Sequence, residues 1–138
     1  MKILVCISHV PDTTSKINFT DNNKSFDTNG IQYIINPNDE FGLTKAVWMK
    51  ESHKAEVVVA SVGEAPCEST LRKCLAIGAD RAIRVNMNPL DGFSVAKQLV
   101  HICEKEKFDL IIAGRESIDY NGGMVPGIVA ELMNYNYV

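Results

Sequence analysis

The residues best suited to binding chemistry lie in one polar stretch that begins at Gly114 and runs into a predicted helix over 127–133. Four residues in this stretch tolerate sharp turns and left-handed backbone conformations, so that backbone N–H groups can point outward: Asp119, Asn121, Gly122 and Gly123. The helix that follows adds free amide groups and the positive end of its dipole at the same point. The pattern predicts a phosphate or nucleotide site, although an ordinary strand-to-helix connection without a ligand also uses glycine and asparagine.

Side chains suited to acid, base or nucleophilic catalysis are few. Ser117 has no histidine near it in the sequence, and Asp39 and Asp119 form a carboxylate pair only if the fold brings them together. Each acid also has an ordinary structural explanation, because Asp39 falls in the first turn of a predicted helix and Asp119 is a turn former. A binding module fits this inventory better than a hydrolase or phosphotransferase that would use Asp39 or Asp119.

Composition and motifs exclude several classes of function. The formal net charge is −3 and no cluster of Lys or Arg is present, which argues against a nucleic-acid binder. The apolar runs are far shorter than the ~20 residues of a membrane-spanning helix, and the N-terminal residues lead into a strand with no cleavage-site pattern. Neither Gly-x-Gly-x-x-Gly nor Gly-x-x-x-x-Gly-Lys-Ser/Thr occurs, so the usual dinucleotide-dependent dehydrogenase and P-loop hydrolase are excluded as well.

No metal site is predicted. The cysteines fall singly in or near apolar segments without a Cys-x-x-Cys pair, and the histidines are scattered: Cys6, Cys67, Cys74 and Cys103; His9, His53 and His101. Cysteines in this pattern are expected to be reduced thiols that pack in the core of a cytoplasmic protein.

The elements that must position the polar stretch alternate along the chain. Short apolar runs predict strands over 2–8, 56–63, 81–85, 110–113 and 135–138. Helices are predicted between them, over 37–53, 65–77, 91–107 and 127–133. Asn36 is expected to cap the first helix, and the apolar face of this helix is expected to hold Phe41, Thr44, Val47 and Trp48.

An insertion separates the first strand from the first helix. Residues 9–15 are predicted to form a turn-rich loop, and alternation over 16–20 and 24–27 predicts an exposed hairpin, followed by an extended piece over 31–35. Such an insertion is long for a strand-to-helix connection, which indicates a functional loop.

Strands separated by helices predict a single α/β domain over 1–138, with a doubly wound parallel five-stranded sheet in the order 3-2-1-4-5. In such a sheet the ligand crevice opens where the strand order reverses, here between the first and fourth strands. We therefore expect the loops at Ser8–Asp12 and Gly114–Gly123 to face one another over one pocket.

Several motifs spread over the whole chain carry a resemblance to a known family. They are the opening Lys2–Ile7 with Val10-Pro11-Asp12, the run Ile35–Glu40, the block Leu71–Ile83 and the block Asp109–Asp119. The Leu-Arg-x-x-Leu-Ala-x-Gly-Ala-Asp and Gly-Arg/Lys-x-x-Ile-Asp patterns together are specific. The chain resembles the beta subunit of electron transfer flavoproteins, including its nitrogen-fixation-type relatives.

The resemblance implies a three-layer adenine-nucleotide-binding fold of the HUP type and a role as an electron carrier rather than an enzyme. It implies a heterodimer with an alpha subunit that carries most of the FAD site, dehydrogenases as electron donors, and AMP or a second FAD in this chain. Carried over by matching motifs, the nucleotide would contact Cys6, Asn36, Pro37, Asn38, Asp39, Val59, Ser61, Gly114, Arg115, Glu116, Ser117, Ile118, Asp119, Tyr120, Asn121, Gly122, Gly123, Met124 and Val125.

The chain departs from the family pattern in its loop and its length. Tyr120–Gly127 stands where many members have Asn-Gln-Thr-Gly, and Val125 replaces the threonine hydroxyl, so AMP and a second FAD both stay open. Family chains are considerably longer, and we expect this chain to be a fragment or isolated domain. A stand-alone ATP-binding regulatory module, similar to universal stress proteins, is the alternative from a different class.

Overall fold

A computed structural model describes residues 1–138 as an α/β domain built on one parallel sheet. The sheet has four strands in the order β7-β6-β1-β8, which are Arg81–Val85, Glu56–Val62, Lys2–Cys6 and Leu110–Ile112. All neighbouring pairs are parallel. The α/β class and the predicted order 3-2-1-4 of the first four strands are confirmed, and β1 lies at the centre beside β8, where the order reverses.

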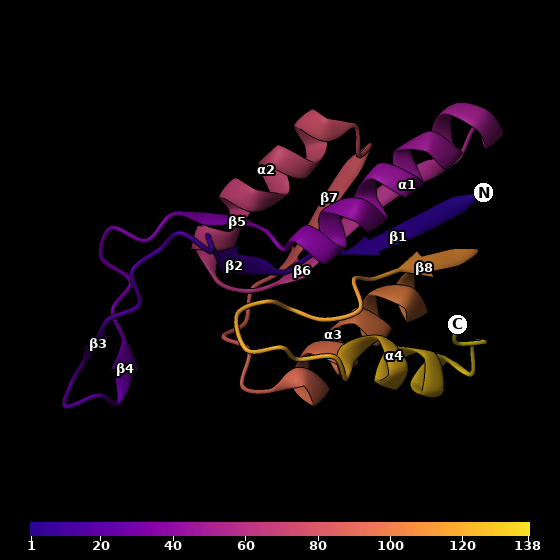
Figure 1. The fold of residues 1–138 in the computed structure, drawn as a ribbon. Helices are drawn as coiled ribbons and strands as arrows, with labels where there is room; N and C mark the ends of the chain where they lie inside the picture. Colours follow the sequence, from indigo (N-terminus) through magenta and orange to yellow (C-terminus); the bar gives the residue numbers. More distant parts are fainter.

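Helices cover both faces of this sheet, as Figure 1 shows. Helices α1 (Pro37–His53) and α2 (Glu68–Ile77) lie on one face, and a 3-10 turn over Ala65–Cys67 leads into α2. On the other face α3 (Gly92–Lys105) packs beside α4 (Val125–Met133). None of the helices has the length and hydropathy that spanning a bilayer requires.

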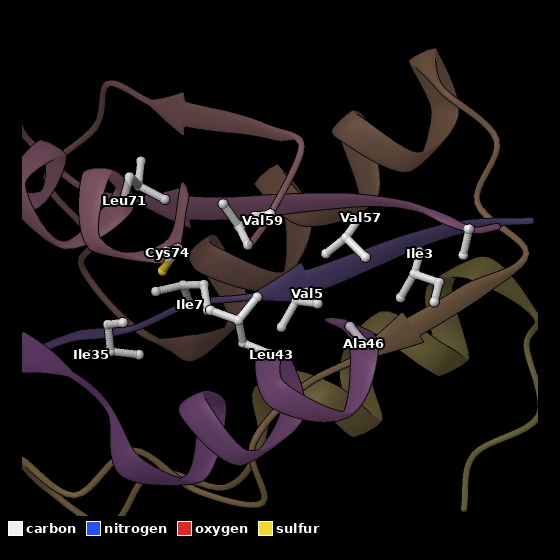
Figure 2. Close-up of a cluster of buried hydrophobic side chains, with 12 residues drawn as sticks. Ile3, Val5, Ile7, Ile35, Leu43, Ala46, Val57, Val59, Leu71 and Cys74 are labelled. Atoms are coloured by element: carbon white, nitrogen blue, oxygen red, sulfur yellow. The ribbon is translucent and has the colours of Figure 1, made fainter. Parts of the chain in front are cut away.

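Two hydrophobic clusters join these layers because β1 and β6 are apolar along most of their length and send alternate side chains to opposite faces. Ile3, Val5, Val57 and Val59 pack with Leu43 toward α1 and α2 (Figure 2). Leu4, Val58 and Ala60 pack with Leu99 and Val129 of α3 and α4 instead. Packing on both faces leaves the ends of the strands as the place where a ligand can be bound.

The packed face of α1 differs from the prediction. Leu43 and Ala46 are fully buried, whereas Phe41 and Trp48 are 76% and 62% exposed. Val47 packs against the core as predicted. Phe41 and Trp48 were assigned to the wrong face because α1 has no strong amphipathic pattern, and the sequence analysis gave the aromatic side chains more weight than the smaller residues. The sheet selects the smaller side chains, which allow the helix to pack closely against it.

The insertion after β1 contains more regular structure than predicted. His9–Pro11 forms β2, a short strand antiparallel to β5 (Tyr33–Ile35), where only a loop was expected. The predicted hairpin is present as β3 (Phe19–Thr20) and β4 (Ser25–Phe26), with left-handed residues at Asp21–Asn23. This hairpin projects away from the body of the domain (Figure 1).

The predicted fifth strand is absent. Asn134 ends α4 in a left-handed conformation, and the Tyr135 N–H donates to the Ala130 carbonyl at 2.9 Å. The Tyr135 hydroxyl donates to the Phe108 carbonyl at 3.1 Å. Residues 135–138 have a strand-like composition but no backbone hydrogen bonds to β8, and a strand exists only where a neighbour supplies such bonds.

Candidate functional site

A cavity of about 1320 Å³ opens at the carboxyl edge of the sheet. Its walls come from the segments that follow β1, β6, β7 and β8, together with the start of α4 and part of the insertion. Ser8 and His9 line it from the first predicted loop, and most of Gly114–Gly123 lines it from the second. The two loops therefore share one pocket, although Asp12 lies outside it and its N–H bonds to the Gln32 carbonyl.

Asp39 connects the ends of the two central strands. Its carboxylate accepts the Ser8 N–H at 2.8 Å after β1 and the Gly114 N–H at 2.9 Å after β8. The residue is only 4% exposed, and burial raises the pKa of this carboxyl while the N–H groups of Ser8 and Gly114 oppose the rise. Asp39 thus sets the spacing between the two loops that form the pocket.

Gly114 has no room for a side chain beside this carboxylate. A Cβ atom there would lie 2.8 Å from the Asn38 Cβ and 2.9 Å from the Asn38 backbone carbon, and would also collide with Asp39. The glycine is required by this close approach of β8 to the start of α1, since its φ is not in the left-handed region.

Asn36 and Asn38 hold the long loop after β8 in place. Both side-chain amides donate to the Glu116 carbonyl, at 2.9 and 3.0 Å, and the Asn36 amide oxygen accepts the Ile118 N–H at 3.3 Å. Asn36 does not cap α1 through its side chain as predicted, because that side chain is fully buried against the loop. The sequence analysis identified Asn36 as important, but it predicted a helix cap where the structure has a contact with the loop.

The loop then closes on itself before α4. The Ser117 N–H donates to the Gly122 carbonyl at 3.0 Å, and the Ser117 hydroxyl donates to the Asp119 carboxylate. Only Asn121 adopts the left-handed conformation that was also expected at its neighbours, with a φ of 56°. Gly122 and Gly123 have ordinary negative or extended backbone angles.

The end of this loop presents unpaired backbone donors. The N–H groups of Gly123, Met124 and Val125 have no acceptor in the chain, and α4 has no side-chain cap at Met124. The helix begins at Val125, before the predicted start at Gly127. Free amides beside the positive end of a helix dipole favour an anionic ligand group, and these three residues line the cavity.

The structure separates the predicted site residues into two groups. Those that line the cavity are Cys6, Asp39, Gly114, Glu116, Ser117, Asp119, Tyr120, Asn121, Gly122, Gly123, Met124 and Val125. Those that do not are Asn36, Pro37, Asn38, Val59, Ser61, Arg115 and Ile118. Ala60 and Val62 line it in place of Val59 and Ser61, because alternate residues of a strand face opposite sides.

Other lining residues were missed by the sequence interpretation. They are Tyr33 of β5, Thr28 from the insertion, Gly63–Glu64 and Pro66–Cys67 after β6, and Asn88–Gly92 before α3. A usable signal was present, since every strand-end loop of a parallel sheet opens at the same edge. The loop that contains His9 was expected at the pocket, but His9 was not named as a ligand contact, and Tyr33 was not singled out at all.

Few side chains in the cavity are suited to catalysis. Both Asp39 oxygens accept backbone N–H groups, and no hydrogen bond joins Asp39 to Asp119. All cysteines are free and buried, and burial raises the pKa of Cys6 above its usual range and that of Cys74 to about 12. No cluster of His, Cys, Asp or Glu has the geometry of a metal site. The free amides at Gly123–Val125 suit an anionic ligand group, whereas the rest of the lining carries acids and no Lys or Arg: Asp39, Glu64, Asp91, Glu116 and Asp119.

Comparisons with known proteins agree on one family. Residues 24–138 match the electron transfer flavoprotein domain. The chain is similar to the electron transfer flavoprotein subunit beta of Bacillus subtilis, with 33% identity over 138 residues, 97% of this chain and 53% of that protein. The human subunit is 35% identical over 125 residues, 86% of this chain and 49% of that protein. The subunit from Syntrophomonas wolfei is 37% identical over 140 residues, 100% of this chain and 55% of that protein. The chain spans about half the length of these relatives.

Proposed function

Because this chain belongs to the electron transfer flavoprotein family, we propose that it is the nucleotide-binding part of a beta subunit. In this proposal the beta subunit forms a heterodimer with an alpha subunit that holds most of the FAD site. The heterodimer takes electrons from dehydrogenases in the cytoplasm and passes them to an acceptor. This chain binds AMP or a second FAD in the cavity at the carboxyl edge of its sheet.

The observation that carries this proposal is the set of free N–H groups at Gly123, Met124 and Val125 on the cavity wall. A phosphate group accepts several N–H donors at once, and the helix dipole of α4 favours its negative charge. Val125 has no hydroxyl to offer, so backbone amides take over the role that a threonine side chain has in many relatives.

The loop that presents these amides is held in one shape. Asn36 and Asn38 bind the Glu116 carbonyl, and Asp39 binds the Gly114 N–H at the start of the loop. A loop that is already ordered loses less entropy when a ligand binds. We assign these three residues and Gly114 to positioning the nucleotide-binding loop, and the lining residues from Glu116 to Val125 to ligand contact.

The shortage of acid–base groups agrees with an electron carrier. A flavin supplies the redox chemistry when it is bound, and the protein has only to hold the nucleotide and exclude side reactions. The cavity volume of about 1320 Å³ exceeds the range of roughly 300–1,000 Å³ usual for small-molecule sites. A space of this size can hold either AMP or the larger FAD.

Identification of the bound nucleotide tests the proposal. The full-length protein, co-expressed with its alpha partner, is denatured, and the released nucleotides are identified by chromatography and mass. One FAD and one AMP per heterodimer would support a conventional carrier, and two FAD would support a second flavin in this cavity. A protein without nucleotide that also forms no stable complex would overturn the proposal in favour of a stand-alone ATP-binding module.

A further inference from the structure

We propose that His9 is an additional nucleotide contact, which offers an uncharged Nε2–H donor to a hydrogen-bond acceptor on the ligand. The inference rests on the proposed function, because it concerns the same cavity. His9 lines that cavity from β2, on the side of the sheet covered by α2, whereas the amides of Gly123–Val125 approach it from the side covered by α4.

The proton of the His9 ring is directed to Nε2 by Thr70. The Thr70 hydroxyl lies 2.8 Å from His9 Nδ1, and Thr70 is fully buried on α2. No other acceptor in the chain is within hydrogen-bonding reach of this hydroxyl. The hydroxyl must therefore donate to Nδ1, since the opposite arrangement would leave its buried hydrogen unpaired. A neutral ring with an acceptor at Nδ1 carries its hydrogen on Nε2.

The ring plane of His9 is held as well. The ring stacks on Tyr33 of β5, with centroids 4.2 Å apart and an interplanar angle of 8°. The two residues belong to the paired strands β2 and β5, where His9 lies opposite Ile35 and Pro11 lies opposite Tyr33. A side chain fixed by a hydrogen bond at one edge and stacking on one face is preorganised for a contact at its remaining nitrogen.

The surroundings of His9 keep the ring neutral. Burial lowers the pKa of His9, and the nearby Lys73 ammonium on α2 lowers it further. The Nε2–H group has no acceptor in the chain, and because no buried side-chain nitrogen or oxygen lacks a partner, this nitrogen is accessible at the cavity that His9 lines. A donor that is oriented, uncharged and unpaired on a cavity wall is suited to an acceptor oxygen or nitrogen of a ligand.

The ligand atom belongs to the part of the nucleotide outside the phosphate held by α4. Ring nitrogens of the base, ribose hydroxyls and a second phosphate all share the required acceptor chemistry. AMP, adenosine and FAD used as separate probes distinguish these sources, because adenosine has no phosphate and FAD has two.

The test removes the Nε2–H group while the local packing is retained. In the double variant His9→Phe with Thr70→Val, the ring can still stack on Tyr33 and no buried hydroxyl is left unpaired. Binding of AMP, adenosine and FAD is measured by calorimetry on the full-length heterodimer after its nucleotides have been removed. We expect binding of at least one probe to weaken about five- to ten-fold, the effect of one lost hydrogen bond.

Two control variants separate this role from a structural one. Thr70→Val alone keeps the His9 ring but removes the hydroxyl that fixes its hydrogen on Nε2. The ring can then adopt either neutral tautomer, so the affinity for the probes should fall by at most about two-fold. His101→Phe removes an exposed histidine of α3 that does not line the cavity, and should leave affinity unchanged. Equal affinity of the double variant and the wild type for all three probes would overturn the role of His9 alone. If the wild type bound none of the probes, both the role of His9 and the proposed function would be overturned.

A measurement on the wild-type protein avoids any folding defect of the variants. The ¹H–¹⁵N correlation spectrum of the His9 ring should show a neutral Nε2–H tautomer near pH 7, and the Nε2 resonance should move when the binding probe is added. A resonance that did not move at saturating ligand would contradict the inference, even if the double variant failed to fold.

Discussion

At each end of the parallel strands a carboxylate connects two of them. One of these carboxylates is exposed and paired with cations, whereas the other is buried. At the amino edge, Glu106 accepts from Lys2 Nζ at 2.6 Å and from Arg81 Nη1 at 2.9 Å, and its side chain is 28% exposed. At the carboxyl edge, Asp39 is almost fully buried and accepts the backbone N–H groups of Ser8 and Gly114. Solvent-exposed ion pairs connect the strands at the amino edge. Buried hydrogen bonds connect them at the carboxyl edge, and these bonds also shape the cavity.

These different environments shift the pKa values of Glu106 and Asp39 in opposite directions. Hydrogen bonds from Arg81 and Lys2 lower the pKa of Glu106 to about 2, whereas burial raises the pKa of Asp39. Glu106 therefore stabilises the fold above its unfolded pKa, and this stability is lost as the pH falls. The raised pKa of Asp39 has the opposite effect on stability. Because ionisation of this carboxyl is less favourable in the folded state, its contribution to the free energy of unfolding falls as the pH rises. Ionisation of Asp39 therefore costs stability at neutral pH, while its hydrogen bonds to the Ser8 and Gly114 N–H groups hold the two loops together.

The largest effect is expected from a methyl group at the carboxyl edge. Gly114→Ala would force the Cβ atom against the Asn38 backbone and Asp39, which costs overpacking energy and weakens the hydrogen bond between Gly114 and Asp39. We expect a loss of about 4 kcal/mol in the free energy of unfolding, measured by chemical denaturation, and loss of nucleotide binding.

Gly127→Ala is the matched control, because a Cβ atom there meets nothing within 4 Å. This helical position should become more stable by ~0.5–1 kcal/mol. Equal effects of the two substitutions would mean that the close approach at Gly114 does not matter.

Asp39→Ala should have the next largest effect. It leaves the N–H groups of Ser8 and Gly114 without an acceptor in a buried site, at a cost of about 3 kcal/mol. Thermal and denaturant unfolding measure the loss, and AMP binding should weaken because the two loops are no longer held together. Glu40→Ala removes the neighbouring acid in the first turn of α1, which is exposed, and should change little.

Asn36→Ala should cost about 2 kcal/mol, because the Glu116 carbonyl loses a donor and the Ile118 N–H loses its acceptor. Asn36→Ser separates this contact from helix capping. Serine is as good a capping residue as asparagine, but it is too short to reach the loop. A denaturation curve of Asn36→Ser close to the wild type would favour the capping role, and one close to Asn36→Ala would favour the contact with the loop.

The smallest effect at neutral pH is expected at the amino edge. Glu106→Gln should change stability by less than about 1 kcal/mol at pH 7 and leave nucleotide binding unaltered. Between pH 4.5 and about 2, the wild type should lose this stability and the variant should not. Melting temperatures over that range measure the difference. Glu104→Gln, at an exposed position near the end of α3, should behave like the wild type.

Much of this molecule was predictable from local sequence. Apolar runs of β-branched residues located β1, β6, β7 and β8, and Gly78 and Lys54 end helices close to the expected positions. Strand order followed from the handedness of crossover connections, and the position of the pocket followed from that order. The polar loop after β8, and the family resemblance that its residues carry, led to a nucleotide as the proposed ligand, which stays a prediction.

Other features depend on residues far apart in the sequence and were not accessible to local patterns. The contact of Asn36 with Glu116, the pairing of His9 with Thr70, and the absence of a fifth strand after Asn134 each depend on what the fold brings alongside. A side-chain amide or imidazole offers the same hydrogen-bonding groups in many settings, and its partner is chosen only when the chain packs. The four strands of the parallel sheet, their order and the helices were therefore determined by the sequence pattern of this protein, whereas only tertiary packing decided the pairing of β2 with β5, the absence of a fifth strand, and which polar groups line the cavity or hold it in shape.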